Sequence, residues 1–169
     1  MSVAIRGRIA ALARAHALIR VSEAKSTALR QSSLEDLVTA ISEPYCNNTA
    51  TTQNNRIVID GPQVMLGNEA ITALALVLHE LATNALKYGA FSTALGQIYI
   101  SWNVTDGALN MTWRETSGPK ISGPPSVEGF GSLLARHSIE GQLHGKLAFE
   151  WDVKGLTVTL SVDVEQLEN

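Results

Sequence analysis

The 169-residue sequence contains one cysteine, few charged residues and no long uninterrupted apolar run. Cys46 alone cannot form an intramolecular disulfide or a cysteine-based metal cluster, which fits a reducing compartment. The net charge is −3 without a basic block, so the sequence offers no cationic face for nucleic acid. Because no apolar run reaches about 18 residues, we expect no membrane-spanning segment in this chain.

Hydrophobic residues make up 45% of the sequence, enough for the core of one ordinary domain with a short extension. Apolar residues recur at helical spacing over residues 5–20, which predicts a first helix there. The polar residues 21–31 are expected to form a connector. Ser33 and Asp36 form a capping-box pattern, which predicts a second helix that ends at Pro44. The expected buried stripe of this helix consists of Leu34, Leu37, Val38 and Ile41.

The middle of the sequence predicts two short strands followed by a long helix. Strand signals cover residues 56–60 and 64–66. The helix is expected over residues 69–88, with Asn68 as its N-cap. Gly89 is expected to end it in the left-handed conformation.

The remainder predicts two hairpins separated by a loop and a short helix. Their strands are expected at residues 97–104, 109–113, 146–152 and 156–164, with turns at Asp106-Gly107 and Lys154-Gly155. Residues 116–129 hold three of the five prolines, which indicates a long loop, and residues 130–140 form the short helix. The order of elements predicts an α+β two-layer sandwich, with helices on one face of a mostly antiparallel sheet.

The long helix carries a polar face opposite its apolar one. Glu80 and Asn84 are four residues apart and are therefore neighbours, and their oxygens suit Mg²⁺. Thr83 lies on the same face, and Lys87, one turn on, offers a charge for a phosphate oxygen. Judged on this helix alone, a solvated face of an amphipathic helix is the favoured explanation, since solvated faces are the usual case.

A second group of polar residues and glycines follows at structural junctions. Residues 113–119, Trp-Arg-Glu-Thr-Ser-Gly-Pro, end a predicted strand. After the loop, residues 129–132, Gly-Phe-Gly-Ser, open a helix. Glycines before a helix N-terminus let backbone N–H groups approach a phosphate. The ordered series therefore favours a nucleotide site over a solvated helix face.

These motifs together resemble a known family. Residues 78–85, Leu-His-Glu-Leu-Ala-Thr-Asn-Ala, resemble the N box of the Bergerat-fold (GHKL) ATPases. Residues 113–119 resemble the first glycine box of the HWE histidine kinases, which are named for a histidine in the N box, here His79, and a Trp-x-Glu motif, here Trp113 and Glu115. Residues 129–132 resemble the second glycine box.

The resemblance implies ATP and Mg²⁺ as cofactors and a role for each motif residue. Glu80 would polarise the attacking group or a metal-bound water, and Asn84 would hold Mg²⁺. His79 is a candidate for either a catalytic or a structural role. Lys87 and Tyr88 would lie near phosphate or ribose.

The glycine boxes would complete the site around the base and the phosphates. Glu115 would accept the amino hydrogen of adenine, next to Gly118. Residues 116–129 would form the ATP lid, with Gly129 and Gly131 as its hinge. The binding set implied at the second glycine box is Gly129, Phe130, Gly131 and Ser132.

For the whole protein, the resemblance implies a cytoplasmic two-component sensor histidine kinase. Residues 1–31 would be the remnant of a dimerising, phosphoacceptor helical region, and residues 32–169 the ATP-binding domain. We find no phosphoacceptor, since the surroundings of His16 resemble the downstream part of that hairpin. The γ-phosphoryl would then pass to a histidine outside this chain, in a homodimeric parent that serves a response regulator.

Two departures from the family pattern keep alternatives open. Ser117 stands where relatives usually have glycine, and Leu133 stands where many carry a basic residue. These departures motivate one alternative, a degenerate domain that binds partners without nucleotide. The other alternative is a Bergerat-fold protein-serine kinase, against which the Trp-x-Glu pattern and the helix over residues 6–20 argue. Of the residues outside the motifs, Trp102 and Trp151 are expected to pack within the sheet, as Trp113 is, and His137 and His144 receive no function.

Overall fold

The computed structural model describes residues 32–46, 56–126 and 129–168. The helix expected over residues 5–20 lies outside the described residues, so the domain division at residue 31 stays a prediction. In chain order the elements are β1 (Ser32–Ser33), α2 (Leu34–Cys46), β2 (Ile57–Asp60), β3 (Met65–Leu66), α3 (Asn68–Lys87), the 3₁₀-helix η1 (Ala90–Ser92), β4 (Gln97–Thr105), β5 (Ala108–Thr116), α4 (Phe130–Arg136), the π-helix η2 (His137–Gln142), β6 (Lys146–Asp152), β7 (Gly155–Asp163) and α5 (Val164–Leu167).

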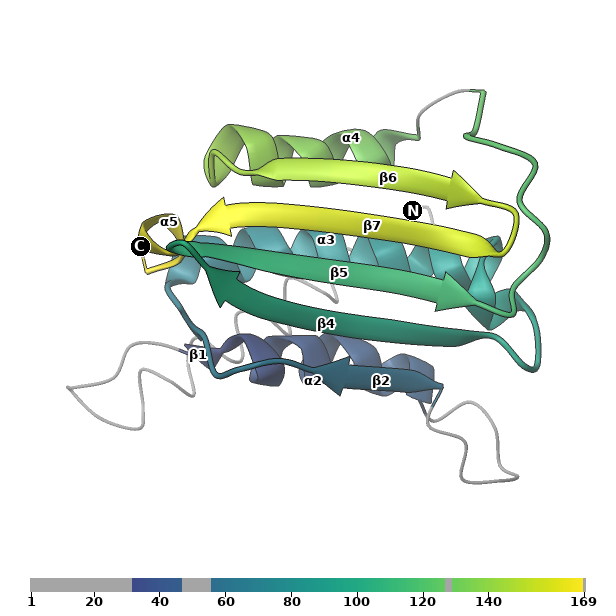
Figure 1. Cartoon of the computed structure of the whole chain (residues 1–169), viewed down its shortest axis with the longest axis horizontal. Helices are drawn as coiled ribbons and strands as arrows, with labels where there is room; N and C mark the ends of the chain where they lie inside the picture. Colours follow the sequence, from purple (N-terminus) through teal and green to yellow (C-terminus); the bar gives the residue numbers. More distant parts are fainter. Residues whose placement is uncertain (1–31, 47–55, 127–128, 169) are drawn as a thin grey trace, which may run out of the picture.

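The fold is a five-stranded sheet covered on one face by helices, as the sequence predicts (Figure 1). The strand order is β2-β4-β5-β7-β6, and β1 pairs separately with β3. Only the β2–β4 pair of the five-stranded sheet is parallel. In Figure 1 the long helix α3 runs behind the central strands, with α2 behind β2 and α4 beside β6.

Alternating burial shows which face of the sheet meets the helices. Along β5, buried residues alternate with more exposed ones, so every second side chain points into the core. The β4–β5 hairpin closes through Asp106 and Gly107, whose φ angles are 54° and 77°. Two successive positive φ angles are typical of the type I′ turn, which matches the twist of the strands.

The start of α2 is the capping box that the sequence predicts. The Ser33 hydroxyl accepts a hydrogen bond from the Asp36 N–H at 3.1 Å, and Asp36 Oδ2 accepts one from the Ser33 N–H at 3.3 Å. The predicted stripe is buried, at 2% exposure or less. The predicted end at Pro44 is wrong, because α2 continues to Cys46. A proline in the last turn removes only one helical hydrogen bond, which a packed helix tolerates.

Both predicted caps of α3 are wrong in detail. Gly67 is the N-cap, without a side-chain cap bond, and Asn68 is already helical. Gly89 has φ −108° and ψ −148°, which is not the left-handed conformation. The last turn is closed instead by the N–H groups of Tyr88 and Gly89, which bond to carbonyls of Asn84 and Ala85. The requirement for glycine at position 89 must therefore have another cause.

The helix α3 is the centre of the core. Together with η1 it forms the segment Asn68–Ser92, which is long and apolar enough, by length and composition, to cross a membrane, but 67% of its apolar 18-residue window is buried inside the fold. Such burial is typical of the core helix of a globular domain. The last predicted helix, residues 130–140, is α4 continued by η2 to Gln142.

The capping box gives a prediction about stability. Ser33→Ala should lower the free energy of unfolding by about 1 kcal/mol, because the Asp36 N–H loses its acceptor. Urea unfolding followed by circular dichroism would measure the change. Thr39→Ala, at an exposed position in the middle of the same helix, is the matched control. Equal effects of the two variants would contradict a capping role for Ser33.

Candidate functional site

The polar face of α3 lies where the helix passes from the core to the surface. Glu80 is 7% exposed, Thr83 and Asn84 are half-buried, and Lys87 is exposed. No hydrogen bond joins the Asn84 carboxamide to any of the described residues, although its backbone carbonyl closes the helix. A half-buried carboxamide without a protein partner is suited to bind a ligand or a metal ion.

His79 is buried and ties α3 to α2. Its Nδ1 lies 3.5 Å from the Tyr45 hydroxyl, and its Nε2 lies 3.4 Å from the Thr83 hydroxyl. The Tyr45 ring in turn stacks on Phe91, with 6.2 Å between ring centroids. A hydroxyl at each ring nitrogen favours one orientation of the imidazole, so the surroundings of His79 support a positioning role.

Glu115, at the end of β5, is a buried carboxylate with both oxygens held by the protein. It is 4% exposed. Oε2 accepts a hydrogen bond from the Ala90 N–H at 2.7 Å, and Oε1 accepts one from Trp113 Nε1 at 3.1 Å. Burial raises the pKa of Glu115 above its ordinary value of 4.5, and the hydrogen bonds from Ala90 and Trp113 act in the opposite direction.

The contact between Glu115 and α3 explains the glycine at position 89. A Cβ atom on Gly89 would lie 2.0 Å from Glu115 Oε2, far inside van der Waals contact. The sequence pattern identified Gly89 but assigned it the wrong reason, because the neighbour that excludes a side chain is 26 positions away along the chain. The strand end and the turn after α3 are therefore packed directly against each other.

The residues after Glu115 strengthen this junction. A Cβ on Gly118 would lie 3.1 Å from the Ala90 backbone, and Thr93 Oγ1 donates to the Ser117 carbonyl at 2.7 Å. Ser117 has φ 56°, a left-handed conformation that glycine adopts more easily. Ser117 therefore occupies a backbone position at which glycine would be less strained.

Arg56 belongs to the same region and was missed by the sequence reasoning. Its guanidinium donates to the carbonyls of Gly96, Ala90 and Thr93, at 2.9, 3.1 and 2.5 Å. It also lies 4.9 Å from the centroid of the Phe91 ring. These bonds fix the turn between α3 and β4, and nothing in the local sequence around Arg56 signals them.

The second glycine box opens α4, as expected. Gly129 is the N-cap residue, and its carbonyl accepts the first helical bond from Leu133 N at 3.1 Å. The helix α4 packs against α3. Gly131 and Ser132 are half-buried, whereas Phe130 is 69% exposed and Tyr88, at the end of α3, is 74% exposed.

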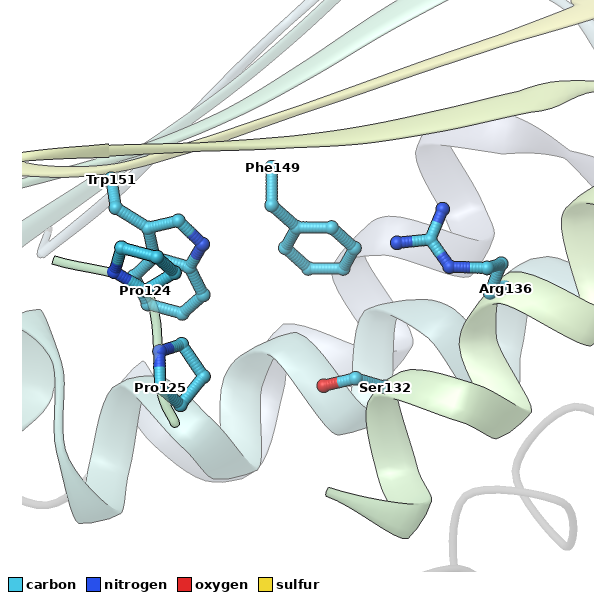
Figure 2. Close-up of a pocket in the computed structure, with 6 residues that line it drawn as sticks. All are labelled: Pro124, Pro125, Ser132, Arg136, Phe149 and Trp151. Atoms are coloured by element: carbon cyan, nitrogen blue, oxygen red, sulfur yellow. The ribbon is translucent and has the colours of Figure 1, made fainter. Parts of the chain in front are cut away.

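A pocket of about 380 Å³ lies between the loop after β5, α4 and β6 (Figure 2). It is lined by Pro124, Pro125, Ser132, Arg136, Phe149 and Trp151. Figure 2 shows the two prolines beside the Trp151 ring, with the Ser132 hydroxyl facing the same space. Trp151 is 37% exposed and stacks on Phe149 of the same strand with 6.3 Å between centroids, so it packs on the sheet as expected and also lines the pocket.

The structure therefore places Glu115 of the first glycine box directly against the turn after α3. The helix α4, which the second glycine box opens, packs against α3. Glu80, Asn84 and Glu115 do not line the pocket in Figure 2, which shares only Ser132 with the predicted site residues. Among the described residues, no group of three or more His, Cys, Asp or Glu side chains could hold a metal ion. A cation at Asn84 would need additional ligands from water or a bound polyanion.

Known proteins with similar sequences are histidine kinases. Blue-light-activated histidine kinase 1 of Erythrobacter litoralis is 38% identical over 163 residues, which is 95% of this chain and 43% of that protein. The blue-light-activated histidine kinase of Rhizobium johnstonii is 33% identical over 165 residues, which is 95% of this chain and 44% of that protein. No family model matches the sequence.

Over 95% of its length the chain is similar to blue-light-activated histidine kinases, which are of the HWE type. It spans less than half the length of the two relatives. The fold is that of a histidine kinase catalytic domain, which confirms the predicted α+β sandwich of GHKL type. The histidine kinase domain of the Erythrobacter litoralis EL346 kinase superimposes with a TM-score of 0.69 at 19% identity, over 96% of this chain and 80% of that one. The ThkA catalytic domain gives 0.60 at 17% identity, over 79% and 94%.

The raised pKa of Glu115 in this kinase domain gives a prediction about pH. The folded state binds the proton more tightly than the unfolded chain does. The contribution of Glu115 to the free energy of unfolding therefore falls as pH rises from about 4.5 through the raised pKa, and is constant above it. Glu115→Gln removes this titration, so the stability of the variant relative to the parent should rise as pH increases from about 4.5 through the raised pKa.

Urea unfolding at a series of pH values would measure this difference. Glu150→Gln, at an exposed position on β6, is the matched control. A difference between Glu115→Gln and the parent that stays constant with pH would contradict the assignment of a raised pKa to this carboxyl.

Proposed function

We propose that this chain is the ATP-binding catalytic domain of a two-component sensor histidine kinase, and that its site takes ATP with Mg²⁺. The observation that carries the proposal is the junction of Glu115 with the turn after α3. Through this junction, Glu115 of the Trp-x-Glu motif meets the turn that follows the helix with the N-box residues, 25 positions earlier in the sequence. The homologues, which are named histidine kinases, support the same conclusion.

The α3 face would supply the metal end of the site. Asn84, whose carboxamide has no partner among the described residues, would be the direct Mg²⁺ ligand, and Glu80 would act through a metal-bound water. One carboxamide and one carboxylate suit Mg²⁺, which keeps several water ligands and takes others from phosphate oxygens. Lys87 and Tyr88, exposed at the end of α3, would lie near the phosphates or the ribose.

The glycine boxes would hold the base and the phosphates. Glu115, beside Gly118, would accept a hydrogen bond from the adenine amino group, since each carboxylate oxygen can accept more than one bond. The first turn of α4, from Gly129 to Ser132, would present backbone N–H groups to the phosphates. The loop between the two boxes would act as the lid over the nucleotide.

In the proposed reaction, the γ-phosphoryl passes to a histidine on a helical domain of the parent kinase. Phosphoryl transfer depends mostly on positioning and on neutralisation of charge, which the residues above would provide. Glu80, 7% exposed, would polarise the attacking group, and His79 would hold the adjacent helix surface in place through Tyr45 and Thr83. The parent would be a cytoplasmic homodimer whose phosphoryl group passes on to a response regulator.

The metal role of Asn84 can be tested directly. Asn84→Ala should abolish the Mg²⁺-dependent part of ATP binding, because it removes the direct ligand. Isothermal calorimetry with ATP, with and without Mg²⁺, would measure this. Asn110→Ala, at an exposed position on β5, is the matched control. Unchanged affinity in Asn84→Ala would refute the metal role, and a parent chain without ATP binding would favour a degenerate, partner-binding domain.

The transfer reaction needs a separate experiment. The chain would be mixed with radiolabelled ATP, Mg²⁺ and a separately produced helical hairpin that carries the acceptor histidine of an HWE kinase. We expect phosphate on the hairpin that is labile in acid and stable in base, as a phosphohistidine is. Acid-stable phosphate on the hairpin would instead support transfer to a serine.

A further inference from the structure

The inner face of β5 carries a row of buried side chains that ends in a carboxylate. Leu109, Met111 and Trp113 are at most 3% exposed, and Glu115, the next in the row, is 4% exposed. The two-residue period of a strand places all four on the same face. A carboxylate at the end of an apolar row needs hydrogen-bond donors, because burial without them is costly.

The two donors come from different elements and hold different oxygens. Trp113, two residues earlier on the same strand, donates its indole N–H to Oε1, and Ala90, in the turn after α3, donates its backbone N–H to Oε2. Together they define both the position and the plane of the carboxylate. An ionised carboxylate has about four lone-pair sites, so each oxygen can still accept a further bond.

Gly89 restricts the carboxylate from a third side. A Cβ atom added to Gly89 would lie 2.0 Å from Oε2, so the carboxylate packs directly against the backbone of Gly89. Movement of the carboxylate toward α3 is therefore blocked by the main chain. The remaining freedom is rotation, which the hydrogen bond from Trp113 opposes.

We propose that Trp113 is a positioning residue for Glu115, and that this pair makes the nucleotide site prefer adenine over guanine. The proposal rests on the proposed function, in which Glu115 accepts the adenine amino group. Adenine has an amino donor where guanine has a carbonyl oxygen. A fixed carboxylate therefore attracts the amino group of adenine and repels the carbonyl oxygen of guanine.

The discrimination depends on fixation because guanine also has N–H donors near its carbonyl. A carboxylate that can rotate would reach these donors and would then accept guanine as well. The indole N–H of Trp113 prevents this rotation. The sequence predicted only core packing for Trp113. In addition, the Trp-x-Glu spacing places the indole N–H where it can hold the carboxylate in one orientation.

The test is Trp113→Phe in the full chain, which keeps an aromatic ring in the core and removes the N–H donor. The affinities for Mg²⁺–ATP and Mg²⁺–GTP would be measured by calorimetry. We expect the ratio of the GTP dissociation constant to the ATP dissociation constant to fall roughly tenfold, the effect of one hydrogen bond to a charged group.

Trp102→Phe is the matched control, because it also removes a buried indole donor from the same sheet. Trp102 is 5% exposed, and its N–H donates to the Pro62 carbonyl at 2.7 Å, remote from Glu115 in the β4–β5 register. This variant should lose stability and keep the parent ratio of the two dissociation constants. A comparable fall in that ratio for Trp102→Phe would overturn the proposal.

A second measurement needs no nucleotide. Carbon-13 NMR of the Glu115 carboxyl across a pH series reports its pKa, which the Trp113 donor lowers. Trp113→Phe should therefore raise the pKa of Glu115 further, and Trp102→Phe should leave it unchanged. An unchanged pKa in Trp113→Phe would show that the indole does not control the carboxylate, and would overturn the proposal.

If Trp113→Phe does not fold, Gly89→Ala reaches the same carboxylate without altering the sheet core. Its Cβ would displace Oε2, and the preference for ATP over GTP should fall in the same way. An unchanged preference in folded Trp113→Phe would overturn the role of Trp113, and an unchanged preference in folded Gly89→Ala would overturn the dependence of that preference on a fixed carboxylate. Either result would leave the proposed function intact. A parent chain that binds neither nucleotide would overturn the proposed function and this inference together.

Discussion

The arrangement of the candidate site depends on one buried carboxylate that must be hydrogen-bonded on both sides. Glu115 is the last buried residue of the central strand β5, and an unpartnered charge at this position would be severely destabilising. One donor comes from Trp113 within the sheet, and the other comes from Ala90 in the helical layer. The need to satisfy this charge therefore fixes the end of α3 against the end of β5, in addition to the apolar packing between the two layers.

The junction is close-packed because three glycines from different segments meet around Glu115 and Ala90. A Cβ on Gly89 would overlap the Glu115 carboxylate, a Cβ on Gly118 would press on the Ala90 backbone, and a Cβ on Gly155 would lie 2.0 Å from the Glu115 carbonyl oxygen. The three segments are the turn after α3, the start of the loop after β5, and the β6–β7 turn. Because glycine has no side chain, the turn after α3, the loop after β5 and the β6–β7 turn can all approach Glu115 and Ala90 closely.

Features that depend on neighbours in sequence could be predicted, and features that depend on distant contacts could not. The stripe of α2, its Ser33–Asp36 capping box and the hairpin turn at Asp106-Gly107 follow from spacing alone. The reason for Gly89 was missed, because its neighbour Glu115 comes from another element. Arg56 was missed for the same cause, since its acceptors lie 34 to 40 positions away. The place of Trp151 in the pocket was missed because β6 is an edge strand, and neither alternation nor composition shows which strand is at the edge.

The central position of β5 explains why the Trp-x-Glu spacing can fix the location of the Glu115 carboxylate. The register of β5 is set on both sides, since Glu115 lies opposite Ile98 of β4 and Trp113 lies opposite both Ile100 of β4 and Val158 of β7. A shift by one residue would turn the indole and the carboxylate to the outer face and would expose the apolar row. The sheet therefore specifies where Glu115 lies, and a loop is not required to do so. A hydrogen-bond acceptor held by a central strand is better fixed than one held by a mobile segment, because its placement is coupled to the stability of the whole sheet.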